Sequence, residues 1–262
     1  MKKIPSRVLT ALIGIPIVAA LIYLGGPIFF IVAFALALVA LRELEAACLK
    51  AGTPIDPILS YALLIWLMLR GWHHNSDQVA LWPLPVALCL WAVFWYPAQA
   101  RPTLQSIALT LLAVSYTSLF LYIPLLRLRP THGFILMWLT ILGVWTGDTA
   151  AYYAGRRFGK TKLTQLSPGK TLEGALAGGI ATVAVCAWIT HAGHLGLGQG
   201  IALGVLIAIA APLGDLVESF WKRELGVKDL GTLLPGHGGV LDRCDSLLFA
   251  CALVYGVTRG WG

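Results

Sequence analysis

The residues best suited to chemistry lie together near the C-terminus, between Gly214 and Ser246. This stretch alternates carboxylates with cations, although 58% of the whole chain is hydrophobic. Its ionisable residues are Asp215, Glu218, Lys222, Arg223, Glu224, Lys228, Asp229, His237, Asp242, Arg243 and Asp245. Mixed charge beside long apolar runs is costly to bury in a membrane, so we expect the stretch to line a water-filled site at a membrane face.

Three aspartates of this stretch are spaced as ligands of one cation. Asp215 ends an apolar run, and Asp242 and Asp245 lie three residues apart where the last apolar run begins. All three are therefore expected at one membrane depth. Carboxylate oxygens suit Mg²⁺, so Asp215, Asp242 and Asp245 are the predicted metal ligands. The alternative is a network of interfacial salt bridges, because each carboxylate has a basic neighbour.

If the helix that holds Asp215 continues, one helical face carries polar side chains at intervals of three and four. That face consists of Asp215, Glu218, Ser219, Lys222 and Arg223. With Arg243, the cations of this region can hold phosphate groups beside a metal. The pattern favours phosphoryl or nucleotidyl transfer, in which a protein mainly positions reactants and stabilises charge. For His237, three roles stay open: general base, phosphate donor and packing within the glycine-rich turn.

A second polar segment spans residues 145–174. Asp148 lies near the end of an apolar run and is a functional candidate, because a charge inside a span costs about 2.5–3.5 kcal/mol on insertion scales. The alternative for Asp148 is a surface ion pair with Arg156 or Arg157.

The loop after this run contains glycines and the lysines at 160, 162 and 170. Such a loop can bring backbone N–H groups and ammonium groups to phosphate oxygens, or it can act only as a determinant of membrane topology. The Gly-Lys-Thr sequence at 169–171 resembles the end of a Walker loop. The upstream glycine and the preceding strand are missing, which excludes a P-loop nucleotide triphosphatase.

Membrane-spanning helices must position these residues. Only 12% of the chain is charged, and several apolar runs reach the roughly 17–25 residues that cross a bilayer as a helix. We predict an all-α polytopic membrane protein with about nine spans. The expected spans are Val8–Leu24, Pro27–Leu41, Pro57–Leu69, Val79–Tyr96, Leu104–Leu126, Gly133–Ala151, Ala175–Thr190, Gly200–Val217 and Asp245–Thr258. Residues 1–132 form the N-terminal helices, and residues 133–262 form a catalytic region with loops 152–174 and 218–244.

The basic residues indicate the orientation. Fifteen Lys and Arg residues fall on the side that holds the N-terminus and the loops 152–174 and 218–244, and four fall on the other side. The positive-inside rule places the fifteen in the cytoplasm. The first apolar run, which begins at Val8, is expected to remain as a membrane helix rather than to be cleaved as a signal peptide. The five cysteines lack Cys-x-x-Cys spacing and are expected to pack within helices. The net charge of +7 thus reflects topology and anionic headgroups, and no basic block indicates nucleic acid.

These polar segments resemble the signature of a known family. The resemblance is carried by Ser219-Phe-Trp-Lys222-Arg223, by Lys228-Asp229, and by Pro235-Gly-His237-Gly-Gly-Val-Leu-Asp242-Arg243-Cys-Asp245. Asp148-Thr149 and Ser167-Pro-Gly-Lys170-Thr-Leu-Glu173-Gly174 are similar to it as well. Together they resemble the phosphatidate cytidylyltransferases, also called CDP-diacylglycerol synthases, over roughly residues 143–246.

The resemblance implies an all-helical homodimer that converts CTP and phosphatidic acid to CDP-diacylglycerol and pyrophosphate, with Mg²⁺ and room for a second cation. It implies a multi-pass protein of a bacterial inner membrane, with its active site on the cytoplasmic side. The implied catalytic residues are Asp215, Lys222, Arg223, Asp242 and Asp245. The implied substrate-binding residues are Asp148, Lys170, Glu173, Ser219, Lys228, His237 and Arg243.

Two other functions stay open. A transporter also contains ionisable residues, but usually near the membrane midplane in broken helices rather than at one face. A CTP-using polyprenol kinase shares the nucleotide and differs in the lipid product. A CDP-alcohol phosphatidyltransferase requires an Asp-Gly…Ala-Arg…Gly…Asp pattern, which this sequence lacks.

Overall fold

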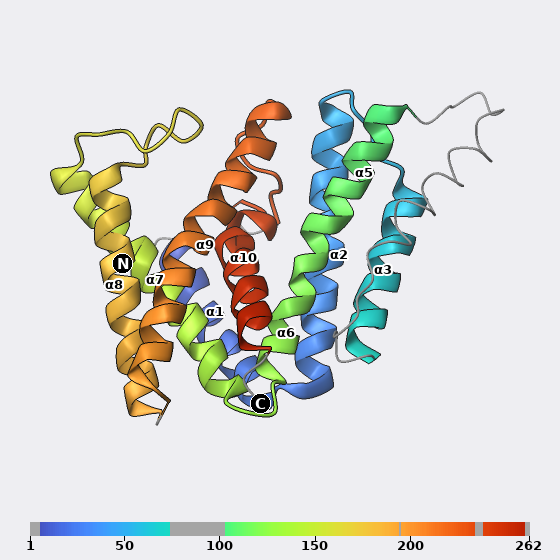
Figure 1. Cartoon of the computed structure of the whole chain (residues 1–262). Helices are drawn as coiled ribbons and strands as arrows, with labels where there is room; N and C mark the ends of the chain where they lie inside the picture. The colour runs from blue at the N-terminus through green and yellow to red at the C-terminus, as the bar shows by residue number, and fades with distance from the viewer. Residues whose placement is uncertain (1–5, 74–102, 194, 234–237, 260–262) are drawn as a thin grey trace, which may run out of the picture.

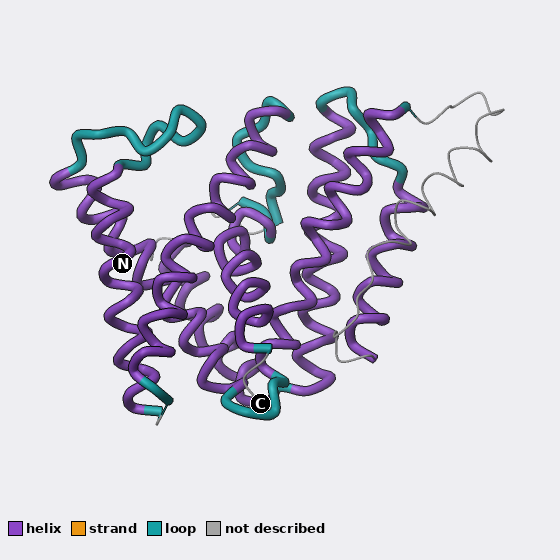
Figure 2. The backbone as a smooth tube through the Cα atoms, in the orientation of Figure 1, coloured by secondary structure: helices purple, strands orange, loops and turns teal. Residues whose placement is uncertain are grey.

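The computed structural model describes residues 6–73, 103–193, 195–233 and 238–259. The regular structure of these residues is helical, and an isolated β-bridge joins Lys162 to Thr171 (Figures 1 and 2). The helices are α1 (Ser6–Leu24), α2 (Gly26–Lys50), α3 (Pro57–His73), α5 (Leu104–Thr117), the 3-10 turn η1 (Ser118–Leu121), α6 (Tyr122–Arg127), α7 (Gly133–Phe158), α8 (Leu172–Ala192), α9 (Leu197–Glu224) and α10 (Leu241–Thr258).

Several of these helices are long and apolar enough to cross a membrane. In the described part of the chain they are Gly26–Lys50, Leu104–Arg127, Gly133–Phe158, Leu172–Ala192 and Leu197–Glu224. The expected class, an all-α polytopic membrane protein, is confirmed. Each expected span coincides with a helix except Val79–Tyr96, which lies outside the described residues, so the number nine stays a prediction.

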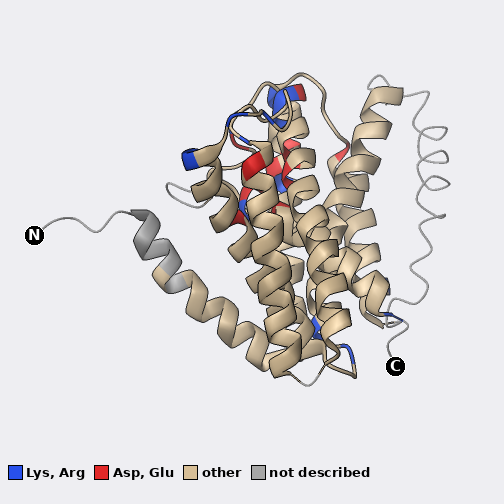
Figure 3. Ribbon diagram, turned by 60° about the vertical axis from the view of Figure 1, so that its left-hand side comes forward, with Lys and Arg blue, Asp and Glu red and all other residues tan. Residues whose placement is uncertain are grey.

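The helices run back and forth between two ends of one bundle (Figure 1). On one side, α8 packs against α7 and α9, and α9 packs against α10. On the other side, α2, α3 and α5 pack together, and η1 and α6 connect them to α10. Helix α1 contacts α2 and α7, and it slants away from the bundle toward its N-terminal end (Figure 3).

Small side chains let α7 and α8 approach closely. The buried residues of α8 are Gly174, Gly178, Thr182, Cys186 and Thr190. They recur at every fourth position and therefore form one stripe along the helix. Thr182 Oγ1 donates a hydrogen bond to the carbonyl of Gly143 in α7 at 3.1 Å. Stripes of small residues with interhelical hydrogen bonds are typical of helix pairs in membranes, and this one holds α7 against α8 near the site.

Several helices extend beyond the expected spans, and the longest extensions are at the C-terminal ends of three of them. Helix α2 continues to Lys50, α7 to Phe158 and α9 to Glu224. Buried apolar positions persist into the polar part of α2, at Ala47 and Cys48. Boundaries drawn from hydropathy end too early here, because these helices continue past the apolar region into a polar end of the bundle.

Charged residues gather toward the two ends of the bundle, and the two ends differ in the kind of charged residue (Figure 3). Where α9 ends and α10 begins, acidic side chains lie beside lysines around Asp215 and Asp245. We call this region the acidic end. At the opposite end, where α6 ends and α7 begins, the charged residues include Arg127 and Arg129, and we call it the arginine end.

Candidate active site

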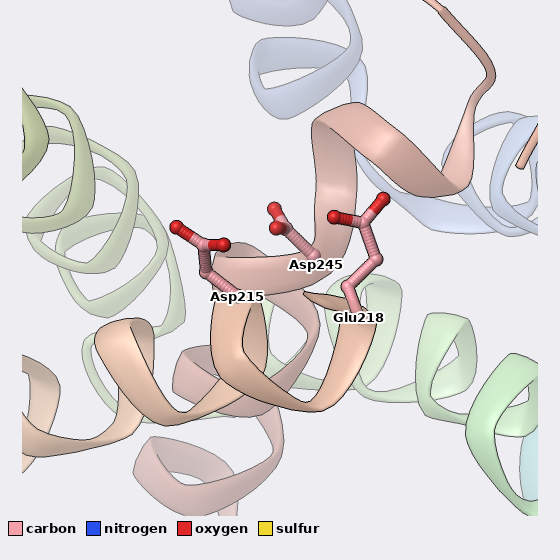
Figure 4. A group of neighbouring side chains, drawn as sticks. All are labelled: Asp215, Glu218 and Asp245. Carbon is pink, nitrogen blue, oxygen red and sulfur yellow. The ribbon is translucent and has the colours of Figure 1, made fainter. Parts of the chain in front are cut away.

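Three carboxylates meet at the acidic end, and we call them the acidic cluster: Asp215, Glu218 and Asp245. The first two lie one turn apart on α9, and Asp245 lies near the start of α10. One oxygen from each carboxylate lies within 4.8 Å of those from the others. Figure 4 shows Asp245 between the other two side chains. The expected continuation of α9 past Asp215 is confirmed, and it brings Glu218 into the cluster.

Gly214 allows α9 and α10 to approach at this point. A side-chain carbon there would lie 3.1 Å from the carbonyl carbon of Asp245 and 3.1 Å from Cδ2 of Phe249. Pro212, inside α9, has no N–H to donate to the preceding turn, so the helical hydrogen bonding is interrupted just before Asp215. The missing side chain at Gly214 therefore lets Asp215 and Asp245 share one site.

Not every carboxylate oxygen of the acidic cluster has a cationic or hydrogen-bonding partner among the described residues. The Glu218 side chain is 3% exposed, and its Oε2 accepts a hydrogen bond from Lys222 Nζ at 2.7 Å. Its Oε1 has no hydrogen-bond partner among the described residues. Asp245 forms no ion pair within the same part of the chain. A buried carboxylate oxygen without a partner costs free energy, and this set of oxygens suits a hard divalent cation.

Asp242 has different surroundings. Its side chain is 2% exposed, and Lys222 Nζ lies 2.7 Å from its Oδ1. Its carboxylate also accepts hydrogen bonds from backbone N–H groups of the segment before α10. These donors are Leu230 (3.2 Å), Gly231 (3.4 Å) and Gly239 (2.6 Å). Of the three predicted metal ligands, the structure thus brings Asp215 and Asp245 together with Glu218, and Asp242 lies next to Glu218, with which it shares Lys222.

A cavity of about 400 Å³ lies beside the acidic cluster. Its walls come from α7, the loop 159–171, and helices α8 and α9, and its charged wall residues include Asp148, Lys170 and Asp215. Asp215 therefore belongs both to the cavity and to the cluster. Apolar residues such as Pro212 line the same cavity. The volume is typical of small-molecule sites, and the mixed wall suits an amphipathic ligand.

The loop 159–171 holds Lys170 in the cavity wall. Leu163 donates its backbone N–H to the carbonyl of Lys170 at 2.9 Å, which closes the loop on itself. Thr171 caps α8, because its Oγ1 accepts a hydrogen bond from the N–H of Gly174 at 3.2 Å. Lys170 then forms an ion pair with Asp215. The loop is thereby anchored to α9 at the acidic cluster.

A profile of the cytidylyltransferase family matches residues 5–260. The chain belongs to this family. It is 35% identical to the phosphatidate cytidylyltransferase of Haemophilus influenzae, over 94% of this chain and 95% of that protein. It is 34% identical to the phosphatidate cytidylyltransferase of Synechocystis sp., over 95% of this chain and 94% of that protein. It is also 34% identical to the phosphatidate cytidylyltransferase of Staphylococcus haemolyticus, over 95% of this chain and 96% of that protein. The family resemblance expected from the polar segments is confirmed.

Other residues of the cytidylyltransferase signature surround the acidic cluster less directly. Ser219 Oγ donates a hydrogen bond to Asp215 Oδ1 at 3.5 Å. Three of the predicted cationic contacts to phosphate or substrate are exposed, namely Arg223, Lys228 and Arg243. His237 lies outside the described residues.

Two further substrate-binding candidates of the signature lie on α7 and α8. Asp148 lines the cavity, and within the described part of the chain it forms no ion pair with the arginines at 156–157. The Glu173 carboxylate accepts hydrogen bonds from the N–H groups of Lys160 and Thr161, both at 3.1 Å. In this arrangement Glu173 holds the start of the loop 159–171.

The sequence alone does not single out three residues of this region. Glu218 lies three residues after Asp215 on the same helical face, but other polar residues share that face, so the spacing does not single it out. Glu43 is buried at the end of α2, among apolar residues that hydropathy places in a loop. Tyr116 of α5 has a buried hydroxyl without a hydrogen-bond partner among the described residues, and it interacts electrostatically with Asp245. No sequence pattern marks Tyr116, because tyrosine is common in apolar helices.

Proposed function

We propose that this chain transfers the cytidylyl group of CTP to phosphatidic acid, producing CDP-diacylglycerol and pyrophosphate. The observation that carries the proposal is that Asp215 belongs both to the acidic cluster and to the cavity. Both substrates are polyanions and one is a lipid, so they require positive charge beside a partly apolar wall. The names of the three relatives support the same pair of substrates.

We propose that the acidic cluster holds a divalent cation, with Mg²⁺ as the best match and room for a second cation. The unpartnered Oε1 of Glu218 supports this fit, as does the convergence of three hard oxygen ligands within 4.8 Å. A bound cation of this kind neutralises polyphosphate charge and stabilises a pyrophosphate leaving group. We assign the third ligand to Glu218, and we assign to Asp242 the role of holding Lys222, because its oxygens already accept hydrogen bonds.

The reaction requires alignment and charge neutralisation rather than a protein base. An oxygen of the lipid phosphate bonds to the α-phosphorus of CTP, the bond from that phosphorus to the bridging oxygen breaks, and pyrophosphate leaves with the bonding electrons. The attacking oxygen is already ionised at neutral pH. Lys222 uses two of its three N–H groups on Glu218 and Asp242, which leaves one for a phosphate. Lys170 contributes a second ammonium group from the cavity wall.

The remaining substrate contacts belong to the same proposal. They are Asp148, Glu173, Ser219, Arg223, Lys228, His237 and Arg243. Asp148 acts from the cavity wall, and Glu173 acts by holding the loop 159–171. The exposed cations attract the anionic substrates to the acidic end.

We further propose that the protein lies in a bacterial inner membrane as a homodimer, with the acidic end facing the cytoplasm. The bias of fifteen basic residues against four supports the orientation. In this arrangement residues 1–132 form the supporting helices, and residues 133–262 form most of the catalytic region.

Product analysis tests the reaction. The purified protein is incubated with CTP and phosphatidic acid, with and without Mg²⁺, and both lipid and nucleotide products are identified. We expect CDP-diacylglycerol and pyrophosphate in equal amounts, and only with the cation present. In a parallel incubation that supplies CTP and a polyprenol in place of phosphatidic acid, formation of a phosphorylated polyprenol together with CDP would indicate the kinase instead. Absence of any CTP-dependent lipid product would overturn the proposal and leave the transporter as the alternative.

Cysteine labelling tests the orientation. The native cysteines are first replaced, and Gln165→Cys and Asp229→Cys are introduced at exposed positions of the acidic end. Leu128→Cys, 37% exposed at the arginine end, is the matched control. A membrane-impermeant maleimide applied to intact cells should label only the Leu128→Cys variant. Labelling of the other two, with no reaction at Leu128→Cys, would reverse the orientation.

A further inference from the structure

Helix α2 reaches the start of α10 through one buried side chain, Glu43, which is 8% exposed. Its Oε1 accepts a hydrogen bond from the N–H of Val240 at 3.0 Å, and its Oε2 accepts one from the N–H of Leu241 at 3.1 Å. These donors are the capping residue and the first residue of α10. Such N–H groups have no acceptor within the helix, and a negative charge beside them is favourable. Glu43 therefore caps a helix that lies 197 residues away in the sequence.

Two glycines allow this approach. A side-chain carbon at Gly231 or at Gly239 would overlap with the Glu43 carboxylate. The backbone before α10 thus passes close to this carboxylate at two separate points. Glycine is the residue that permits so close an approach of backbone to another group, so the local sequence is adapted to Glu43.

Asp242 holds the same segment with its own carboxylate, which accepts hydrogen bonds from backbone N–H groups before α10. We call Glu43 and Asp242 together the carboxylate clamp. The backbone N–H groups bound by the clamp are those of Leu230, Gly231, Gly239, Val240 and Leu241. Buried backbone N–H groups require such partners, so the clamp determines where this segment lies and where α10 begins.

We propose that Glu43 is a positioning residue for the acidic cluster. By fixing the first turn of α10, it places Asp245 beside the two carboxylates of α9 and Asp242 beside Lys222. Glu43 acts through the backbone, because among the described residues it forms no hydrogen bond or ion pair with the cluster itself. The inference deepens the proposed function, since it takes the cluster to be the cation site. Under this inference, a residue from the N-terminal half of the chain helps to position the cation site.

A matched pair of substitutions on α2 tests the role. Glu43→Gln keeps the size of the side chain but replaces one acceptor oxygen with an NH₂ group, which cannot accept the N–H of the α10 cap. Glu45→Gln makes the same chemical change two residues along the helix, at a half-buried side chain that interacts with Tyr61 rather than with α10. A general effect of losing a carboxylate from α2 would appear in both variants.

Two measurements on the purified, folded protein do not depend on turnover. Hydrogen–deuterium exchange of peptides covering 238–246 should become at least about tenfold faster in Glu43→Gln and should stay at the wild-type rate in Glu45→Gln. Mn²⁺ binding, followed by electron paramagnetic resonance, should weaken about tenfold in Glu43→Gln only. In turnover assays, Glu43→Gln should lower kcat and raise the Mg²⁺ concentration for half-maximal activity, and excess Mg²⁺ should restore part of the rate.

The outcomes separate a positioning role from a merely structural one. If Glu43→Gln exchanges and binds Mn²⁺ as the wild type does, the inference is overturned, even if the variant melts earlier. If Glu43→Gln does not fold, Gly231→Ala takes its place, because it displaces the carboxylate without removing its charge. Wild-type Mn²⁺ affinity and exchange in Gly231→Ala would equally contradict the role. If the wild type binds Mn²⁺ but makes no CDP-diacylglycerol, the proposed reaction fails while the clamp is still tested by exchange and binding.

Discussion

The acidic end and the arginine end both place charged side chains in a bundle of apolar helices, but they treat charge differently. At the arginine end, Arg127 Nε donates a hydrogen bond to the carbonyl of Ile22 at 2.6 Å, and the guanidinium lies 5.1 Å from the ring centre of Phe134. Arg129 donates to the carbonyl of Thr258. These carbonyls lie in the last turns of α1 and α10, where helix carbonyls receive no N–H from within the helix. Each arginine therefore satisfies groups that the fold would otherwise leave unpaired.

At the acidic end, the charges themselves are left incompletely paired. Glu218 has a buried oxygen without a partner among the described residues, and Asp245 has no ion pair there. Asp242 and Glu43, by contrast, each accept a backbone N–H at both carboxylate oxygens. Comparing the two ends gives a criterion for telling structural charges from functional ones. A charged group whose hydrogen-bonding and ionic partners are in place stabilises the fold, whereas a buried charged group that lacks partners indicates a ligand-binding site.

The sharpest test of this comparison removes charge from the acidic cluster. Asp215→Asn, Glu218→Gln and Asp245→Asn should each lower kcat/KM by about a thousandfold or more, because the charge that holds the cation is lost. Without Mg²⁺, the melting temperature of Asp245→Asn should stay the same or rise, since repulsion between carboxylates is relieved and Asp245 has no ion pair to lose among the described residues. Mg²⁺ should stabilise only the wild type. Pyrophosphate release and thermal melting in detergent measure these effects. Wild-type rates and Mg²⁺ response in all three variants would place the site elsewhere.

The next largest effect on turnover is expected at Lys222, and its neighbour Arg223 should matter less. Lys222 lies between Glu218 and Asp242, whereas Arg223 is exposed. Lys222→Ala should reduce turnover by about a hundredfold and also lower the melting temperature, because removing one partner of a buried ion pair leaves uncompensated charge. Arg223→Ala should reduce turnover by about tenfold or less and leave melting unchanged. Equal losses in the two single variants would show that the ion pairs of Lys222 have no special role.

Between the two ends, two neighbouring glycines of α8 form a matched pair, because Gly178 belongs to the buried stripe against α7 and Gly179 does not. A side-chain carbon at Gly178 would lie 2.7 Å from the carbonyl oxygen of Gly147 and 3.0 Å from Cβ of Ala151, whereas one at Gly179 would lie 3.7 Å from Cβ of Ala208. Gly178→Ala should destabilise the protein by about 1–3 kcal/mol through overpacking and raise the KM for CTP, because α7 and α8 form cavity walls. Gly179→Ala should change neither quantity. Equal melting temperatures for the two variants would contradict close packing at this stripe.

The smallest effect is expected at the arginine end. Arg129→Gln removes a hydrogen bond to a helix carbonyl and the guanidinium that lies 5.5 Å from the ring centre of Tyr255. The loss should be about 1–2 kcal/mol, or a few degrees in melting temperature, with turnover per folded molecule unchanged. Melting and active-fraction measurements on the same preparation check this. A loss of turnover without a loss of stability would break the distinction between the two ends.

Composition and local pattern were enough to predict the membrane class and the polar stretch that contains the site. Apolar runs define spans because a bilayer requires a long run of apolar residues in one helix. The helical face that starts at Asp215 was predictable as well, because spacing of three and four along α9 decides it. The family resemblance was carried by specific polar motifs, such as the one from Asp242 to Asp245, and the family profile confirmed it.

Which carboxylates converge was decided by packing. The absence of a side chain at Gly214 sets the approach of α9 to α10, and that approach selects Glu218 rather than Asp242 as the neighbour of Asp215 and Asp245. The link from Glu43 to the start of α10 joins residues 197 positions apart. Periodicity and hydropathy describe neighbours along one helix, whereas the partner of a buried carboxylate is whichever backbone N–H group the tertiary fold brings to it.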